Sequence, residues 1–138
     1  MSKTKLILVG GFLAAGKTTM LNALAGRLSG RGFTVGLITN DQAADLVDTA
    51  ILTCTGVEVR EVSGSCFCCN FPGFMAATQS LIDAGCDLIV AEPVGSCTDL
   101  SATILQPVKD QFKDLDLAPL TVLVDPVRLK EEIGRAHV

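Results

Sequence analysis

The segment Gly11-Phe-Leu-Ala-Ala-Gly-Lys-Thr18 constrains the fold of this chain more than any other feature. It matches the pattern G-x-x-x-x-G-K-T in full. A short apolar run, residues 6–9, precedes it, and residues 17–28 follow it with apolar side chains at helical spacing. Glycines let the backbone curl so that successive N–H groups face a phosphate, and the helix start adds partial positive charge. The segment therefore predicts a phosphate-binding loop between a buried strand and a helix.

Lys17 and Thr18 in this pattern each have an expected chemical task. The Lys17 ammonium is expected to reach the β- and γ-phosphates of a nucleoside triphosphate, and the Thr18 hydroxyl is expected to bind Mg²⁺. The other residues expected to bind the nucleotide are Gly11, Ala14, Ala15, Gly16 and Thr19. The alternative is a chance glycine-rich turn between a strand and a helix.

Strand-like and helix-like segments alternate along the chain. Short apolar runs predict strands at residues 6–9, 34–39, 57–62, 87–91 and 120–124. Helices are expected over residues 17–28 and 41–52, behind Pro72, and from residue 99 to 105, where Pro107 disturbs the pattern. This order predicts an α/β domain of the P-loop NTPase type, with a mostly parallel sheet flanked by helices. We assign it to residues 1–132.

The last six residues, 133–138, have a different character. Ile-Gly-Arg-Ala-His-Val resembles the translation of a common sequencing adapter followed by a stop codon. On this interpretation the tail is non-native, the native chain continues past about Glu132, and the domain is incomplete at its C-terminus. An ordinary helix end is the alternative. Sequencing the source gene across this junction distinguishes the two.

Two acidic residues follow predicted strands, where α/β sheets place their ligands. Asp41 comes after the strand at 34–39, and Glu92 comes after the strand at 87–91. A P-loop needs a carboxylate to hold Mg²⁺ and a polar group to place the attacking water. We therefore expect Asp41 and Glu92, with Lys17, to be catalytic, and Asp41 and Glu92, with Thr18, to hold Mg²⁺. A helix cap or a solvated loop acid is the alternative for each.

Three of the six cysteines lie within four positions, at Cys66, Cys68 and Cys69. Thiolates at this density bind Zn²⁺ or another soft metal and leave a fourth position for water or a ligand from a partner. Neighbouring residues of a strand point in opposite directions, so the thiols converge only if the backbone turns here. The alternative is that the cysteines pack as small hydrophobes. Cys97 is a weaker candidate for a fourth ligand, and Cys86 is expected in the core.

Composition excludes several classes of protein. The net charge is -4 and no dense run of Lys or Arg occurs, which argues against nucleic-acid binding. The chain has no Trp and no Tyr to stack on bases. The longest apolar stretch, residues 6–16, is too short to cross a bilayer, and the N-terminus is no signal peptide. We expect a cytoplasmic protein with no membrane partner.

The motifs occur in an order that resembles the CobW-type GTPases of the SIMIBI class, which are metallochaperones related to UreG and HypB. The resemblance rests on the loop at 11–19, then Asn40-Asp41, then Cys66-Phe-Cys-Cys69, then Glu92-Pro-Val-Gly95. It implies GTP hydrolysis coupled to delivery of a metal, zinc in the first instance, or of a metallocofactor to a client protein. It places Asp41 in the first switch, Glu92 in the Walker B position and the three cysteines at the metal. A homodimer is also compatible with it.

The chain departs from the family pattern at several positions. Ser65 replaces a usual Gly, Ala14 stands where Gly is common, and Val94 replaces a usual Ser. No N-K-x-D sequence occurs, so the preference for GTP comes from the resemblance, and ATP stays an alternative. Two other functions stay open: a small-molecule kinase or ATPase, and a zinc-binding protein that senses nucleotide without turnover.

Overall fold

Strands and helices alternate along the chain in the computed structural model, which describes residues 3–11, 17–40, 56–94, 99–127 and 130–131. The strands are β1 (Thr4–Gly11), β2 (Val35–Asn40), β3 (Glu58–Val62), β4 (Leu88–Ala91), β5 (Leu115–Leu117) and β6 (Thr121–Leu123). The helical elements are α1 (Lys17–Gly30), α3 (Phe71–Asp83), the π-helical turn η2 (Ser101–Leu105) and α4 (Gln106–Gln111).

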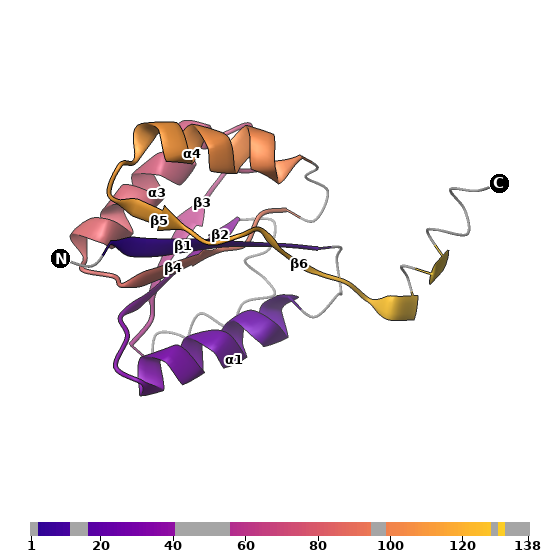
Figure 1. Ribbon diagram of the computed structural model, residues 1–138, viewed down its shortest axis with the longest axis horizontal. Helices are drawn as coiled ribbons and strands as arrows, with labels where there is room; N and C mark the ends of the chain where they lie inside the picture. Colours follow the sequence, from indigo (N-terminus) through magenta and orange to yellow (C-terminus); the bar gives the residue numbers. More distant parts are fainter. Residues whose placement is uncertain (1–2, 12–16, 41–55, 95–98, 128–129, 132–138) are drawn as a thin grey trace.

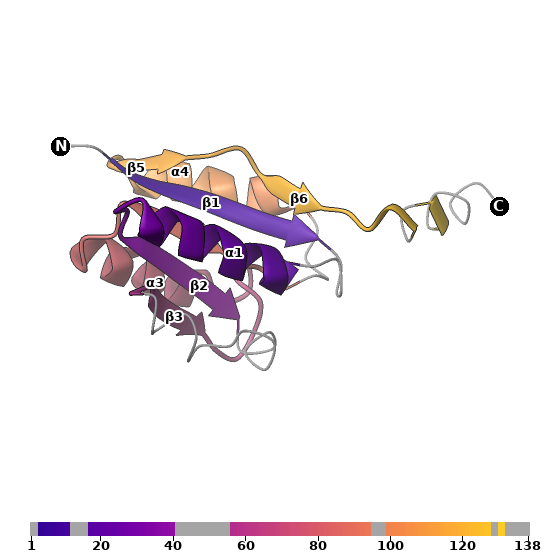
Figure 2. The same ribbon diagram turned by 90° about the horizontal axis from the view of Figure 1, so that it is seen from below.

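The strands form one sheet in the order β3-β2-β4-β1-β5, and β6 also pairs with β1. All of the described pairings are parallel. Figures 1 and 2 show the strands running toward one edge of the sheet, where α1 begins. The predicted α/β fold with a parallel sheet flanked by helices is thus confirmed. Because the strands are parallel, their carboxyl ends meet along that edge.

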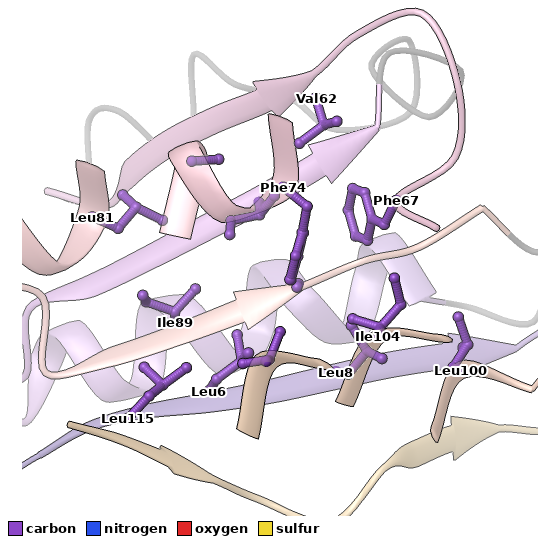
Figure 3. Close-up of a cluster of buried hydrophobic side chains, with 14 of the residues drawn as sticks. Leu6, Leu8, Val62, Phe67, Phe74, Leu81, Ile89, Leu100, Ile104 and Leu115 are labelled. Atoms are coloured by element: carbon purple, nitrogen blue, oxygen red, sulfur yellow. The ribbon is translucent and has the colours of Figure 1, made fainter. Parts of the chain in front are cut away.

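The central strands each contain a buried apolar run, because helices cover both faces of the sheet. Helix α1 lies on one face, and α3 and α4 lie on the other (Figure 1). Leu6 and Leu8 of β1 point to the α3–α4 face, whereas Val9 packs with Leu21 of α1. Figure 3 shows the larger of these two clusters, in which side chains from β1, β4, α3 and η2 meet.

The edge strand beside β1 differs from the prediction. A strand was expected at residues 120–124, and β6 lies there, but β5 at Leu115–Leu117 was not predicted. β5 pairs with the first half of β1 and β6 with its second half. Pro119 lies between them and cannot donate to the ladder, although Ala118 N–H still donates to Leu6 O at 2.9 Å. One edge is therefore built from two short pieces.

Pro107 disturbs the last helix less than expected, because the helix continues through it as α4. The turn before it is π-helical, and Gln106 N–H donates to Ser101 O, five residues back. Pro107 follows directly and has no N–H to donate, so the ladder changes its spacing just before the residue that cannot join it. The helix therefore shifts its hydrogen-bond ladder at this point instead of ending.

Other predictions fall on residues that the structure does not describe. These are the helix at 41–52, Asp41 itself, the loop residues 12–16, Cys97 and the tail 133–138. Within the described ranges, none of the helices combines the length and apolar character that a membrane crossing needs.

Candidate functional site

Buried polar side chains gather at the carboxyl edge of the sheet. Within the described ranges four polar or charged residues are buried, and three of them, Thr39, Asn40 and Glu92, lie where β2 and β4 end. Burying a polar group costs free energy unless it is bonded, so such a concentration marks a site and not a packing core. The edge is also where the sequence places the phosphate loop and the cysteine motif.

Gly11 ends β1 and opens the phosphate-loop sequence. Its φ of 142° lies in a region that favours glycine. A Cβ at this position would lie 2.6 Å from the carbonyl oxygen of Leu123 in β6. The glycine therefore also lets the edge strand pack against the start of the loop. Lys17 and Thr18 are the first two residues of α1, so the loop sequence leads directly into a helix N-terminus.

Glu92 follows β4 directly and is only 3% exposed. Its backbone N–H donates to Ile38 O of β2 at 2.9 Å, which ties the end of β4 to the end of β2. The carboxylate thus lies at the junction of the two central strands. This is the position that the sequence predicts for a carboxylate near Mg²⁺.

The cysteines lie on a tight turn within residues 63–70, here called the cysteine loop. Both Cys69 N–H and Asn70 N–H donate to Cys66 O, at 3.1 and 2.9 Å. The Sγ atoms of Cys66 and Cys68 are 3.0 Å apart, and all three Sγ atoms lie within 4.8 Å of one another. The backbone turn that convergence requires is therefore present.

The three sulfur atoms are close enough to one another to bind a single tetrahedral metal ion. Zn–S bonds of about 2.3 Å place ligand sulfurs roughly 3.8 Å apart. This value lies between the 3.0 Å from Cys66 Sγ to Cys68 Sγ and the 4.8 Å within which all three sulfurs lie. Cys66 and Cys68 are half-buried and Cys69 is exposed, so an ion held by all three would keep one side accessible. The group can hold a soft metal with only small side-chain adjustments.

Phe67, between the first two cysteines, anchors the turn. Its side chain is fully buried, and its ring centroid lies 4.8 Å from that of Phe74 in α3. Figure 3 shows the Phe67 ring beside Phe74 within the core cluster. Phe67 points inward, whereas Cys66 and Cys68 on either side of it are half-buried, and Cys68 also packs against the core cluster.

The thiol of Cys69 holds its proton tightly. Hydrogen bonds to the thiols of Cys66 and Cys68, together with the repulsion between nearby thiolates, raise the pKa of Cys69 to about 11. The pKa of Cys86 is also raised, chiefly because burial disfavours its thiolate. Cys86 is 2% exposed, as expected for a core cysteine.

Two asparagines hold the cysteine loop, and the sequence reasoning gave neither a role. Asn40 Nδ2 donates to Ser65 O, and Asn70 Nδ2 donates to Ser63 O at 3.0 Å. Asn70 also caps α3, because its Oδ1 accepts from Gly73 N–H at 3.2 Å. The sequence could have suggested a role for Asn40, because a polar residue there ends a predicted strand that is mostly apolar.

The structure thus brings some of the predicted residues to one edge and leaves others outside its described ranges. Gly11, the backbone of Lys17 and Thr18, Glu92 and the cysteine loop all lie at the carboxyl ends of the strands. Thr19, in the first turn of α1, is exposed. Ala14, Ala15, Gly16 and Asp41 lie outside the described residues.

A phosphate-loop sequence between β1 and α1 of a parallel sheet defines the P-loop class of nucleotide-binding domains. The family model of the CobW/HypB/UreG nucleotide-binding domain matches residues 5–137, and the chain belongs to this family. The predicted resemblance is thereby confirmed. A comparison with curated proteins gave no match.

Solved structures confirm the fold. The crystal structure of the signal recognition particle receptor FtsY from Elizabethkingia anophelis matches with a TM-score of 0.68 and 18% identity, over 99% of this chain and 46% of that one. The same receptor in complex with GDP matches with a TM-score of 0.61 and 21% identity, over 85% and 40%. The chain spans less than half the length of these proteins, and at such identities the likeness concerns the fold alone.

Proposed function

We propose that this chain is a GTPase domain that couples nucleotide hydrolysis to the binding and delivery of a transition metal, with zinc as the expected ion. The observation that carries the proposal is the convergence of three thiols within 4.8 Å at the sheet edge that bears the phosphate-loop sequence. The family is defined by its nucleotide-binding domain, and a protein of similar fold is known with GDP bound. Thiolate ligands favour zinc over Mg²⁺ or Ca²⁺.

Each residue has a defined task in this proposal. Lys17 binds the β- and γ-phosphates, while Thr18, Asp41 and Glu92 hold Mg²⁺ beside them directly or through water. The other loop residues, Gly11, Ala14, Ala15, Gly16 and Thr19, surround the phosphates. Cys66, Cys68 and Cys69 bind the cargo metal. The exposed side of Cys69 leaves access for a ligand from the client protein that receives the ion.

The test is a zinc titration of the full-length, reduced protein, with GDP and then with a non-hydrolysable GTP analogue. We expect the affinity for Zn²⁺ to differ between the two nucleotide states, because ordering of the first switch by the γ-phosphate reaches the cysteine loop. Tight nucleotide binding without zinc in either state would favour the kinase or ATPase alternative. Zinc and nucleotide binding without turnover, even with the client present, would favour a nucleotide sensor.

Changing Glu92 to Gln is expected to lower the single-turnover rate of GTP hydrolysis by ~10–100-fold, the usual effect of losing a group that orients a metal site through its outer shell. The substitution removes the charge and keeps the shape, so the fold should persist. The measurement is phosphate release at several Mg²⁺ concentrations. Glu61→Gln, the same change on the exposed face of β3, is the control. An unchanged rate in Glu92→Gln at every Mg²⁺ concentration would exclude the assigned role.

Zinc binding is expected to strengthen as the pH rises. The metal binds thiolates, and a pKa of about 11 keeps Cys69 protonated at neutral pH, so binding must release that proton. The apparent affinity should then rise about tenfold per pH unit for each proton released, and should be lost toward acid pH. Calorimetry in buffers of different ionisation enthalpy counts the protons. A pH-independent affinity between pH 6 and 8 would contradict thiolate ligation.

A further inference from the structure

We propose that Asn40 is the positioning residue through which the nucleotide state alters the geometry of the cysteine loop. This inference rests on the proposed function, since it concerns how the two sites communicate. Asn40 is the last residue of β2, and it is fully buried, with an exposed fraction of 0%. A buried amide at a strand end is costly unless its bonds serve the structure around it.

The Asn40 amide acts on the peptide group that leads into the first cysteine. Its Nδ2 donates to the carbonyl oxygen of Ser65, and that carbonyl belongs to the planar peptide unit whose nitrogen is the nitrogen of Cys66. The hydrogen bond to the Ser65 oxygen therefore restricts the orientation of the whole Ser65–Cys66 peptide plane. The plane in turn sets the direction in which the Cys66 side chain leaves the backbone, so a shift of Asn40 redirects the Cys66 thiol.

Asn40 is also joined closely to the proposed nucleotide-sensing residues. Asp41 follows it by one peptide bond. Two residues earlier in β2, Ile38 O accepts the hydrogen bond from Glu92 N–H at 2.9 Å. The end of β2 therefore bonds both to the backbone of Glu92 and to the cysteine loop. A displacement of Asp41 on exchange of GDP for GTP has a short covalent path to the Asn40 side chain.

The other end of the cysteine loop is held by a different element. Asn70 donates to Ser63 O and caps α3, and α3 is packed into the core through Phe74 and Leu81, both with exposed fractions of 0%. Neither of these Asn70 bonds reaches β2, although Ser63 follows Val62, the β3 residue that pairs with Asn40. The loop thus has one end fixed on α3 and one end bonded to a strand that borders the nucleotide site.

If the Cys66 end of the loop moves while the Asn70 end stays on α3, the distance between the Cys66 and Cys68 thiols changes. The Cys66 and Cys68 Sγ atoms are 3.0 Å apart, shorter than the roughly 3.8 Å that tetrahedral zinc requires. Since functional sites tolerate displacements of only about 0.5 Å, a small movement of Cys66 is sufficient to separate a tight metal site from a weak one. The geometry gives Asn40 control of that movement.

A purely structural role for Asn40 makes a different prediction. If the amide only satisfies the Ser65 carbonyl, its removal weakens zinc binding equally with GDP and with the GTP analogue. If Asn40 transmits the nucleotide state, its removal abolishes the difference between the two affinities. The ratio of affinities therefore separates the two roles, whereas either affinity alone does not.

The experiment measures Zn²⁺ affinity of the full-length protein with Mg²⁺ and either GDP or a non-hydrolysable GTP analogue. For the wild type we expect a ratio of at least ~5, the lower range of allosteric coupling. For Asn40→Ala we expect a ratio within about twofold of one, below that coupling range. The matched control, Asn70→Ala, removes an amide from the other end of the loop. It should weaken zinc binding in both states and keep the wild-type ratio.

The outcomes distinguish failure of this inference from failure of the proposed function. A wild-type ratio of one overturns the proposed coupling itself, and the inference with it. A wild-type ratio that persists in Asn40→Ala overturns the inference and leaves the proposed function intact. If Asn40→Ala does not fold, Asn40→Thr suits the strand and offers only a shorter hydroxyl donor. It should reduce the ratio, and an unchanged ratio overturns the inference.

Discussion

Replacing Cys66, Cys68 and Cys69 together by Ser is expected to weaken zinc binding by roughly 10³-fold or more, because all three proposed ligands are lost and complete zinc-finger sites bind with ~10–16 kcal/mol. Serine is close to cysteine in size, and the three side chains are half-buried or exposed, so the domain should keep its fold. Competition against a chelator of known affinity measures the loss. Circular dichroism and nucleotide binding report on the fold.

The control for this variant is Cys86→Ala, which removes a thiol from the core and leaves the cysteine loop intact. It should bind zinc with the same stoichiometry and affinity as the wild type. Equal zinc binding by the triple variant and the wild type would mean that the ion is held elsewhere. Loss of nucleotide binding in the triple variant would show that the loop supports the fold, and single substitutions at exposed Cys69 would then be compared.

Replacing Phe67 by Ala is expected to lower the free energy of unfolding by ~3–5 kcal/mol, the usual cost of removing a fully buried aromatic ring. The ring is inaccessible to solvent and packs at 4.8 Å from Phe74, so its loss leaves a cavity beneath the cysteine loop. Marginal stabilities of ~5–15 kcal/mol make this a large fraction of the total. Denaturant unfolding followed by circular dichroism measures it.

Phe33→Ala provides the comparison, because Phe33 is 48% exposed in the turn before β2. Its replacement should change the free energy of unfolding by less than ~1 kcal/mol, as is typical of surface positions. Phe67→Ala should also weaken zinc binding, since the turn that orients Cys66 and Cys68 loses its anchor. Equal unfolding midpoints for the two variants would refute the anchoring role of Phe67.

Strands and helices with a clear local pattern in their own sequence were predicted correctly. β1, β2 and β4 each contain an uninterrupted apolar run, and Pro72 marks the start of α3. β5 was not predictable, because Leu-Asp-Leu becomes a strand only through its pairing with β1. Likewise Pro107 signals a break, and only the packed structure shows that a π-helical turn absorbs it. Local pattern fixes an element only where tertiary contacts do not compete with it.

The candidate site also has features that the sequence predicted and features that only the structure shows. The types and spacing of the cysteines predicted both a metal-binding group and the turn that brings the thiols together. The inward direction of Phe67 depends on Phe74, a partner seven residues later, and the bond from Asn40 to Ser65 joins residues that only the sheet brings together. Such pairings have no signature in either segment alone. The role of Asp41 stays a prediction, since it lies outside the described residues.

The pairing of β1 has a consequence for how the protein is made. β4, β5 and β6, the strands beside β1 in the described part of the chain, are all synthesised after α3, and Leu123 of β6 packs against Gly11 at the mouth of the loop. Pairings between strands so distant in sequence form slowly, and until they form an emerging chain exposes an unpaired apolar strand. A nascent chain that stops short of β4 already contains the whole glycine-rich segment and the paired strands β2 and β3, yet β1 has none of its described partner strands. We therefore expect nucleotide binding to begin only after β4 and the edge strands have paired with β1.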